Sequence, residues 1–476
     1  MSDTEKERPE PEQLTHEQLV RLVGKLQQLV DAQRSEIEKL RQENERLRRE
    51  GHRQAAPFQR RRRKLNPKRP GRKPGEGPFR HREAPAEEQA GESAAVSRPG
   101  GCPCGGEVEF LHYEEVSNTD LPPRPRPEVR RYRVPVCRCM LCGKTVRGRH
   151  HDVALDQFGA TAHRVGDRAK AAAHVLHYNI GVPQQQVPRI LGELCGLDVT
   201  QGGLSQDAMR RAEQDLATEY AELRKVIRER EVTHTDDTGW RVGGEPAQLM
   251  AFVTGEGESI YQIRPRHRNK EVREVIPGDY PGTMVTDRGR AYDARELDKV
   301  KQQKCVSHIQ RSIDGTLEDK VGRARTFGEH LKGMFKDGQE LWRAYHAGKV
   351  SDRKFKKEAD VIREEISHLL RPRPMRAPDN ERLLSELGWH DDRGNLTRFL
   401  SNPAVPPTNN LAEREIRPAV KARKVSQCSK TWRGARAREC HLSITRTTQR
   451  KISGSLVEAM YLKYRAARTV ARAASP

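Results

Sequence analysis

The order of apolar segments between residues 231 and 309 constrains the fold of this 476-residue chain more than any other feature. Three stretches with strand character, EVTHTDDTGWRV, PAQLMAFVTG and SIYQIRP, follow one another from Glu231. A short helix at 269–276 precedes GTMVTDRGRAY, a strand that ends at Asp287, and a helix at 291–300 and a strand in QQKCVSHI complete the series. This order predicts an RNase H-like sheet, in which the first and fourth strands are neighbours.

Acidic residues occur on those two strands. Asp236 lies in the first strand and Asp287 ends the fourth, so the predicted sheet brings their carboxylates together. An isolated aspartate after a strand is more often a helix cap or turn residue, and this alternative stays open for each one alone.

A third carboxylate follows the proline pair in PAVPPTNNLAEREIRPAVKARK. Thr408 or Asn409 can cap a helix whose first turn carries Glu413. Glu413 and Arg417 are four residues apart, so a plain helical salt bridge also explains the pair. With the two aspartates, Glu413 completes a candidate set of three carboxylates.

The first fifty residues predict a dimerisation helix, over residues 15–50. Apolar residues recur at heptad spacing, and the outer positions are charged or amide. β-branched residues at a with leucine at d favour a parallel two-stranded coiled coil, and a buried Asn fixes its register. A single amphipathic helix packed on the chain's own body is the alternative. The d row is Leu19, Leu26, Leu40 and Leu47, and the a row is Val23, Val30, Ile37 and Asn44.

Residues 51–100 have no periodicity and predict a basic flexible linker. Twelve Lys/Arg and one acidic residue lie between His52 and Arg82. This basic arm, residues 52–82, therefore carries half of the chain's net charge of +22. Extended basic arms neutralise DNA phosphates or enter the minor groove; a solvated tail is the alternative. The candidate DNA contacts are Arg60, Arg61, Arg62, Arg63, Lys64, Arg72 and Lys73.

Five of nine cysteines lie within residues 101–150, which predicts a zinc ribbon. The stretches between them, VEFLHYEEV and EVRRYRVPV, alternate like short strands. Cys137 could replace a ligand, His150 and His151 need not be ligands, and reduced thiols without metal are the alternative. The predicted Zn²⁺ ligands are Cys102, Cys104, Cys139 and Cys142.

Residues 157–230 predict a helical DNA-binding region with helices at 165–179, 183–196 and 204–230. The turn at 196–198 fits a helix-turn-helix, although short helices joined by a turn occur in any bundle. No run approaches the roughly 18 apolar residues that span a bilayer. The N-terminus has no apolar signal core, so no membrane association and a cytoplasmic location are expected.

Four ordered motifs resemble the insertion sequence 66 family of bacterial DDE transposases. These are HTDDTGW, GTMVTDRGRAY, CVSHIQR and NNLAEREIRPAVKARK. The order of coiled coil, basic linker, zinc segment, helical region and catalytic domain is also similar to that family. The first motif has DDT where the family commonly has DET, which leaves Asp237 as a possible substitute ligand.

The resemblance implies a role for each matching residue. Asp236, Asp287 and Glu413 would be the catalytic carboxylates, and Arg423 with Lys424 would contact phosphate. Cys305 and His308 match a C-x-x-H motif that supports the active-site strand in this and related families and is not a metal ligand there by default. The implied fold is multidomain α+β, with an RNase H-like catalytic domain at 231–425, a helical insertion at 315–395 and a C-terminal helical segment at 426–476.

Three carboxylates in one pocket repel one another unless divalent cations neutralise them. Two Mg²⁺ ions held there would serve hydrolysis at the element's inverted ends and transfer of the freed 3′-hydroxyl to target DNA. The predicted partners are double-stranded DNA, a second copy or higher oligomer and small accessory transposition proteins, at the bacterial nucleoid. The alternatives are a catalytically inactive DNA-binding descendant and, with less support, an RNA-binding protein or RNase H-type nuclease.

Overall fold

The computed structural model describes residues 15–52, 86, 96–113, 126–150, 153, 164–318, 320–426 and 428–473. Its centre is a five-stranded mixed sheet in the order β5-β4-β3-β6-β7. β3, β4 and β5 are antiparallel neighbours, whereas β6 is parallel to β3 and β7 is parallel to β6. The predicted adjacency of the first and fourth strands is confirmed, and the order is consistent with an RNase H-like core. The strands are β3 (Val232–Val242), β4 (Glu245–Thr254), β5 (Ser259–Arg264), β6 (Thr283–Thr286) and β7 (Lys301–Lys304).

Both faces of the sheet are covered, which explains the almost continuous apolar run in β4. Leu249, Ala251 and Val253 point to the face on which α12 (Asn410–Ser426) packs. Met250 and Phe252 point to the opposite face, against α5 (Ala217–Glu229) and α6 (Asn269–Arg273). Side chains of the neighbouring strand β3 alternate between the same two faces.

Helix α13 (Trp432–Lys451) closes the outer edge of the sheet. Glu439, Ser443 and Thr447, one turn apart on α13, accept hydrogen bonds of 2.7, 2.9 and 3.0 Å from backbone N–H groups of β5. An uncovered edge strand would offer these groups to another chain. The donors, in the same order, are Ile263, Tyr261 and Ser259.

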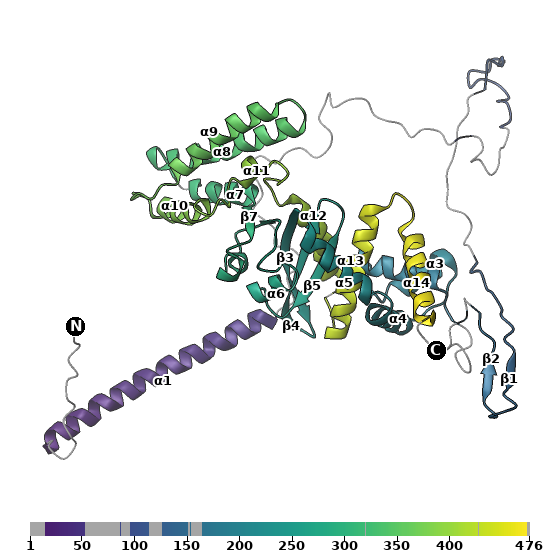
Figure 1. Cartoon of the computed structure of the whole chain (residues 1–476), viewed down its shortest axis with the longest axis horizontal. Coiled ribbons are helices and arrows are strands. Elements are labelled where there is room, and N and C mark those ends of the chain that lie inside the picture. Colours follow the sequence, from purple (N-terminus) through teal and green to yellow (C-terminus); the bar gives the residue numbers. More distant parts are fainter. Residues whose placement is uncertain are drawn as a thin grey trace.

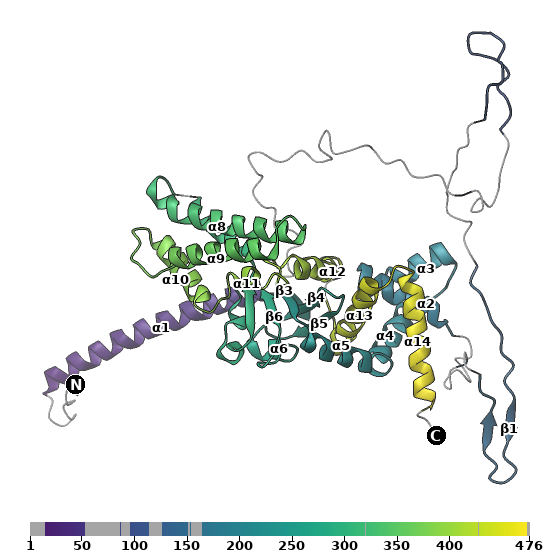
Figure 2. The same cartoon turned by 45° about the horizontal axis from the view of Figure 1, so that its top comes forward.

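A helical bundle with its own apolar core lies between β7 and α12 in sequence. The segment between Asp287 and Glu413 is expected to contain a helical insertion, and the bundle is helical as predicted. Figures 1 and 2 show the bundle on one side of the sheet, and α13 with the helices before β3 on the other. The bundle helices are α7 (Val306–Leu317), α8 (Arg323–His346), α9 (Asp352–Leu369), α10 (Pro378–Asp391) and α11 (Arg398–Ser401).

Around β6 and β7, one local prediction is wrong and another is confirmed in part. The helix expected at 291–300 is a pair of 3₁₀ turns, η4 (Arg290–Tyr292) and η5 (Arg295–Leu297). Tyr292 and Leu297 are both buried in one core, and five residues of α-helix would turn them about 140° apart. The strand expected through QQKCVSHI stops at Lys304, since α7 begins at Val306.

The helices before β3 are more divided than predicted. The third expected helix is two helices, α4 (Gln201–Gln214) and α5, because the buried Leu216 interrupts it. The first is α2 (Asp167–His174) continued by a π-helical turn, η3 (Val175–Ile180). The second is α3 (Val187–Cys195), which packs on α2 and α4 through a small apolar cluster.

The N-terminal segment forms one helix, α1 (His16–His52), as predicted. Val23, Leu26, Val30, Ile37 and Leu40 of its heptad rows are 43–60% exposed, so they are available to a partner helix. Dimerisation stays a prediction. No helix in the described ranges is long and apolar enough to cross a membrane.

In the cysteine-rich segment, strands β1 (Val136–Arg138) and β2 (Thr145–Arg147) form a short hairpin. The strands expected in VEFLHYEEV and EVRRYRVPV are not formed over residues 108–113 and 128–135. Pro135 lacks an N–H donor and lies directly before β1, so beyond Val136 the pairing is limited to the Gly148 N–H, which donates to the Pro135 carbonyl (2.9 Å).

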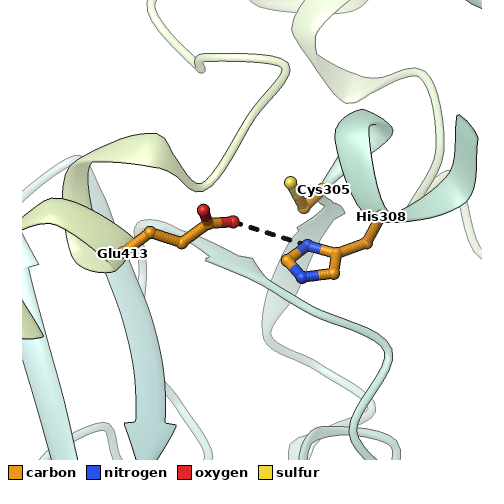
Figure 3. A group of neighbouring side chains, drawn as sticks. All are labelled: Cys305, His308 and Glu413. Carbon is orange, nitrogen blue, oxygen red and sulfur yellow. Dashed lines mark ion pairs between the residues drawn. The ribbon is translucent and has the colours of Figure 1, made fainter. Parts of the chain in front are cut away.

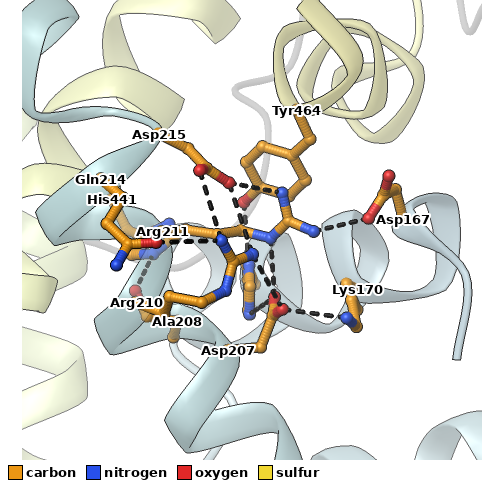
Figure 4. A network of polar contacts seen from close by, with 11 residues as sticks. Asp167, Lys170, Asp207, Ala208, Arg210, Arg211, Gln214, Asp215, His441 and Tyr464 are labelled. Carbon is orange, nitrogen blue, oxygen red and sulfur yellow. Dashed lines mark hydrogen bonds and ion pairs between the residues drawn. The ribbon is translucent and has the colours of Figure 1, made fainter. Parts of the chain in front are cut away.

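A buried arginine joins the helices that precede β3 to the last helix, α14 (Leu456–Ala473) (Figure 4). Arg211 of α4 is 1% exposed and donates to Asp207 (2.7 Å), Asp215 (3.0 Å) and Asp167 (2.6 Å). Its guanidinium also lies over the ring of Tyr464, 4.1 Å from the centroid. One side chain therefore connects α2, α4 and α14.

Arg211→Ala is expected to lower the free energy of unfolding by about 3–5 kcal/mol, because it removes the buried cation that three carboxylates share. Thermal denaturation of the full chain measures the loss. The matched control is Arg210→Ala, a neighbouring arginine whose side chain is 42% exposed, with an expected cost below about 1 kcal/mol. Equal destabilisation by the two variants would contradict the assigned role of Arg211.

Glu258 makes the stability of the sheet depend on pH in the acid range. Its fully buried carboxylate accepts from Lys451 (2.6 Å), Thr254 (2.5 Å) and Arg230 (2.5 Å). Burial opposes ionisation, but these hydrogen bonds outweigh it and lower the pKa of Glu258 to about 2. Because this pKa is depressed, the stabilisation is present above the ordinary value near 4.5 and is lost as the pH falls toward 2.

Glu258→Gln is therefore expected to remove about 3 kcal/mol of stabilisation at neutral pH and to flatten the decline in stability below pH 4.5. Melting temperatures between pH 7 and pH 3 provide the measurement. Glu256→Gln, an exposed residue of the same turn, should keep the wild-type profile. A Glu258→Gln profile parallel to that of wild type would refute the assignment.

Candidate active site

Strand β3 presents its two aspartates to opposite faces of the sheet. Asp236 pairs across the ladder with Ala251 and Asp237 with Met250, residues that belong to the two different cores. Asp237 instead meets His267, with 3.2 Å between its Oδ1 and the imidazole Nδ1. The geometry therefore favours Asp236 over Asp237 as the partner of a carboxylate on α12.

The parallel register places the second aspartate beside the first. His234 of β3 pairs with Val285 of β6, so continuing the two strands by two residues sets Asp236 beside Asp287. Asp287 follows the last residue of β6, and its Oδ1 accepts the backbone N–H of Gly289 (2.9 Å). This contact fixes the carboxylate in the turn at the end of the strand.

Asn409 fixes the start of α12 to β3. It is fully buried, and its Nδ2 donates to the Thr235 carbonyl (2.7 Å) while its Oδ1 lies 3.2 Å from His234 Nδ1. Its own carbonyl accepts the N–H of Glu413 (3.1 Å). Asn409 therefore does not provide the expected side-chain cap of α12. Its side chain contacts the two strand residues before Asp236, and its backbone carbonyl accepts the first hydrogen bond of the helix that carries Glu413.

Electrostatics links the three carboxylates. Burial, followed by the charges of Asp237, Asp287 and Glu413, raises the pKa of Asp236 to about 7. The carboxylate oxygens of the triad do not all lie within 4.8 Å of one another. A two-metal site has ions roughly 3.5–4 Å apart, so its ligands are spread more widely than those of a single ion. Clustered, partly buried oxygen donors fit Mg²⁺.

Cys305 and His308 lie against the third carboxylate (Figure 3). The Cys305 sulfur, a His308 ring nitrogen and a Glu413 oxygen all lie within 4.8 Å of one another, as in no other group of three such side chains in the described chain. The backbone N–H of Cys305 donates to the Thr286 carbonyl (2.8 Å), and its Sγ accepts the N–H of Asn409 (3.2 Å). The motif thus contacts the strand that carries Asp287 and the helix that carries Glu413.

Two residues near the site escaped the sequence reasoning. Burial lowers the pKa of His267, but the hydrogen bond and charge of Asp237 outweigh it and raise the pKa above its usual value. Lys304 is fully buried, with its Nζ 2.7 Å from Asp293 Oδ1 and 3.3 Å from Thr286 Oγ1. Neither residue belongs to a spaced motif, so only the fold reveals its place.

Of the predicted phosphate contacts, Arg423 is half-buried. Its Nη1 donates to Thr238 Oγ1 and to the Gly239 carbonyl, both at 2.8 Å, and so ties α12 to the second half of β3. Lys424 follows it on the same helix. The remaining predicted DNA contacts, Arg60, Arg61, Arg62, Arg63, Lys64, Arg72 and Lys73, lie outside the described residues.

The predicted zinc ligands form two separate turns. Cys102 N–H donates to the Gly106 carbonyl (3.0 Å), and Gly143 N–H donates to the Cys139 carbonyl (2.9 Å). The Cys102 thiol lowers the pKa of Cys104, and backbone N–H groups at Cys142 and Leu141 lower that of Cys139. The structure does not gather these sulfurs, or that of Cys137, into one ligand group.

Comparison with models of known protein families gives a match. The model of the Transposase IS66 family covers residues 163–437, more than half of the chain. No curated protein matches the sequence. The matched segment begins just before α2 and includes the sheet, the bundle and all of α12. The chain therefore belongs to the IS66 family and is a DDE transposase, an enzyme that catalyses DNA cleavage and strand transfer.

Proposed function

We propose that Asp236, Asp287 and Glu413 are the catalytic carboxylates of this transposase and hold two Mg²⁺ ions. Two observations support the assignment: the β3–β6 register, continued by two residues, sets Asp236 beside Asp287, and Asn409 ties the start of α12 to the same strand. Asp237 faces the other side of the sheet, which supports Asp236 as the first member of the triad.

Each carboxylate has a defined task in this proposal. When bound, the cations would activate the attacking oxygen and stabilise the leaving oxygen of an in-line phosphoryl displacement. Asp287 offers its oxygens from a turn held by Gly289, and Glu413 from the start of α12. Burial and the neighbouring carboxylates raise the pKa of Asp236 to about 7, so cation binding would release a proton there and strengthen as the pH rises.

We further propose that the substrate is the inverted ends of the element. The basic arm would supply phosphate contacts and affinity, but little sequence information. The heptad rows of α1 would join two copies so that two DNA ends are held together. The predicted domain boundaries, the zinc ribbon and the small accessory proteins belong to the same proposal.

A strand-transfer assay tests this function. The purified chain is incubated with a labelled element end, target DNA and Mg²⁺, and cleaved and joined products are separated on a denaturing gel. Cleavage at the terminal nucleotide and joining to target are expected, with neither in EDTA. Binding of the end without cleavage by wild-type protein would overturn the proposal in favour of a catalytically inactive DNA-binding descendant.

A further inference from the structure

Cys305, His308 and Glu413 bring three different donor atoms to one place (Figure 3). Cys305 precedes the first residue of α7, His308 lies in the first turn of α7, and Glu413 lies in the first turn of α12. Cys305 is buried and the other two residues are partly buried. Two rigid helix starts therefore face each other with a thiol, an imidazole and a carboxylate between them.

The two facing polar atoms are close but not bonded. His308 Nδ1 lies 3.7 Å from Glu413 Oε1, and neither buried atom has a hydrogen-bond partner within the described chain. A direct His–Glu contact would account for the proximity, but an N–H···O bond would close to about 2.7–3.2 Å. The observed separation leaves both atoms unsatisfied, which is costly for buried groups.

The spacing fits a transition metal. With Zn–N and Zn–O bonds near 2.0–2.2 Å, two ligands of a tetrahedral ion lie roughly 3.4 Å apart, close to the 3.7 Å found here. The N–H of Asn409 on the Cys305 sulfur is the kind of outer hydrogen bond that orients a metal ligand. A sulfur, nitrogen and oxygen donor set suits Zn²⁺ or Co²⁺, whereas Mg²⁺ prefers oxygen alone.

We propose that Cys305 Sγ, His308 Nδ1 and Glu413 Oε1 form a Zn²⁺-class metal site that shares Glu413 with the catalytic centre. Binding releases the Cys305 thiol proton to solvent, and a fourth position stays open to water or DNA phosphate. A metal held here withdraws Glu413 from the Mg²⁺ ions, so Zn²⁺ inhibits DNA cleavage and joining. This inhibition rests on the proposed function, but metal binding does not.

Cobalt titration of the full-length protein tests the binding. Difference spectra between wild type and Cys305→Ser isolate the thiolate at this site from the cysteines of residues 102–142. We expect wild type to show an additional equivalent of tetrahedral Co²⁺ with sulfur-to-cobalt absorption, and His308→Ala to bind that equivalent at least tenfold more weakly. Cys195→Ser, an exposed thiol elsewhere, should match wild type. Circular dichroism verifies that each variant is folded.

Cobalt spectra that are identical in wild type, Cys305→Ser and His308→Ala would overturn the site. The inhibitory role is tested by strand transfer at fixed Mg²⁺ with increasing Zn²⁺, each variant being compared with its own zinc-free rate. Half-inhibition of Cys305→Ser is expected at a Zn²⁺ concentration at least tenfold above that of wild type; equal values would refute the inhibitory role. Cobalt binding at this site, together with full strand transfer by Glu413→Gln, would refute the catalytic assignment of Glu413 and leave the metal site standing.

Discussion

Asp287→Asn is expected to reduce strand transfer at least about 100-fold, which corresponds to roughly 2.7 kcal/mol in the activation barrier. The amide keeps the shape of the side chain and can still accept the Gly289 N–H, so the turn after β6 should persist. It removes the negative charge that a divalent cation needs from this position. The measurement is the rate of product formation from a labelled element end at saturating Mg²⁺, together with end binding by gel shift.

Asp237→Asn is the matched control for Asp287→Asn, because it makes the same change from carboxylate to amide. Asp237 is adjacent to Asp236 in sequence but lies on the opposite face of the sheet. It loses the contact with His267, and we expect its strand-transfer rate to stay within about tenfold of wild type. Glu413→Gln should resemble Asp287→Asn. Turnover that survives both Asp287→Asn and Glu413→Gln would show that the carboxylate assignment is wrong.

The sheet could be predicted because local sequence patterns indicate the order of its strands along the chain. β3, β4 and β5 are apolar runs separated by Gly and charged turns, and a short helix separates them from β6. The order of these segments then determines which strands are adjacent, and so which aspartates meet. The 3₁₀ turns between residues 290 and 297 could not be predicted from these patterns, because the break follows from the burial of both Tyr292 and Leu297 in one core.

Contacts between distant residues could not be predicted in this way. The bond from Asn409 to Thr235 crosses 174 positions, and that from Arg438 to the imidazole of His177 crosses 261. Neither pair belongs to a periodic pattern. The sequence therefore shows each residue as a polar side chain and does not indicate which distant residue it contacts. The packing of α13 along β5 could not be predicted either. In the sequence, Glu439, Ser443 and Thr447 look like the polar face of any exposed helix.

Asn409 is the residue of this kind with the largest expected effect on catalysis. Asn409→Ala leaves the Thr235 carbonyl and His234 Nδ1 buried without their partner, which should cost about 2–4 kcal/mol of stability. It also frees the start of α12 from β3, so Glu413 is no longer held at a fixed distance from Asp236. We expect strand transfer at saturating Mg²⁺ to fall at least about tenfold, and half-maximal activity to require more Mg²⁺.

Asn410→Ala separates positioning from general helix stability, since Asn410 is the adjacent amide, lies in the first turn of α12 and is exposed. It should change the free energy of unfolding by less than about 1 kcal/mol and leave the Mg²⁺ dependence as in wild type. Assays run well below the melting temperature of Asn409→Ala keep that variant folded, so a higher Mg²⁺ requirement then reports a displaced ligand. An Asn409→Ala protein that melts earlier but keeps the wild-type Mg²⁺ dependence would show that Asn409 stabilises the fold without setting the position of Glu413.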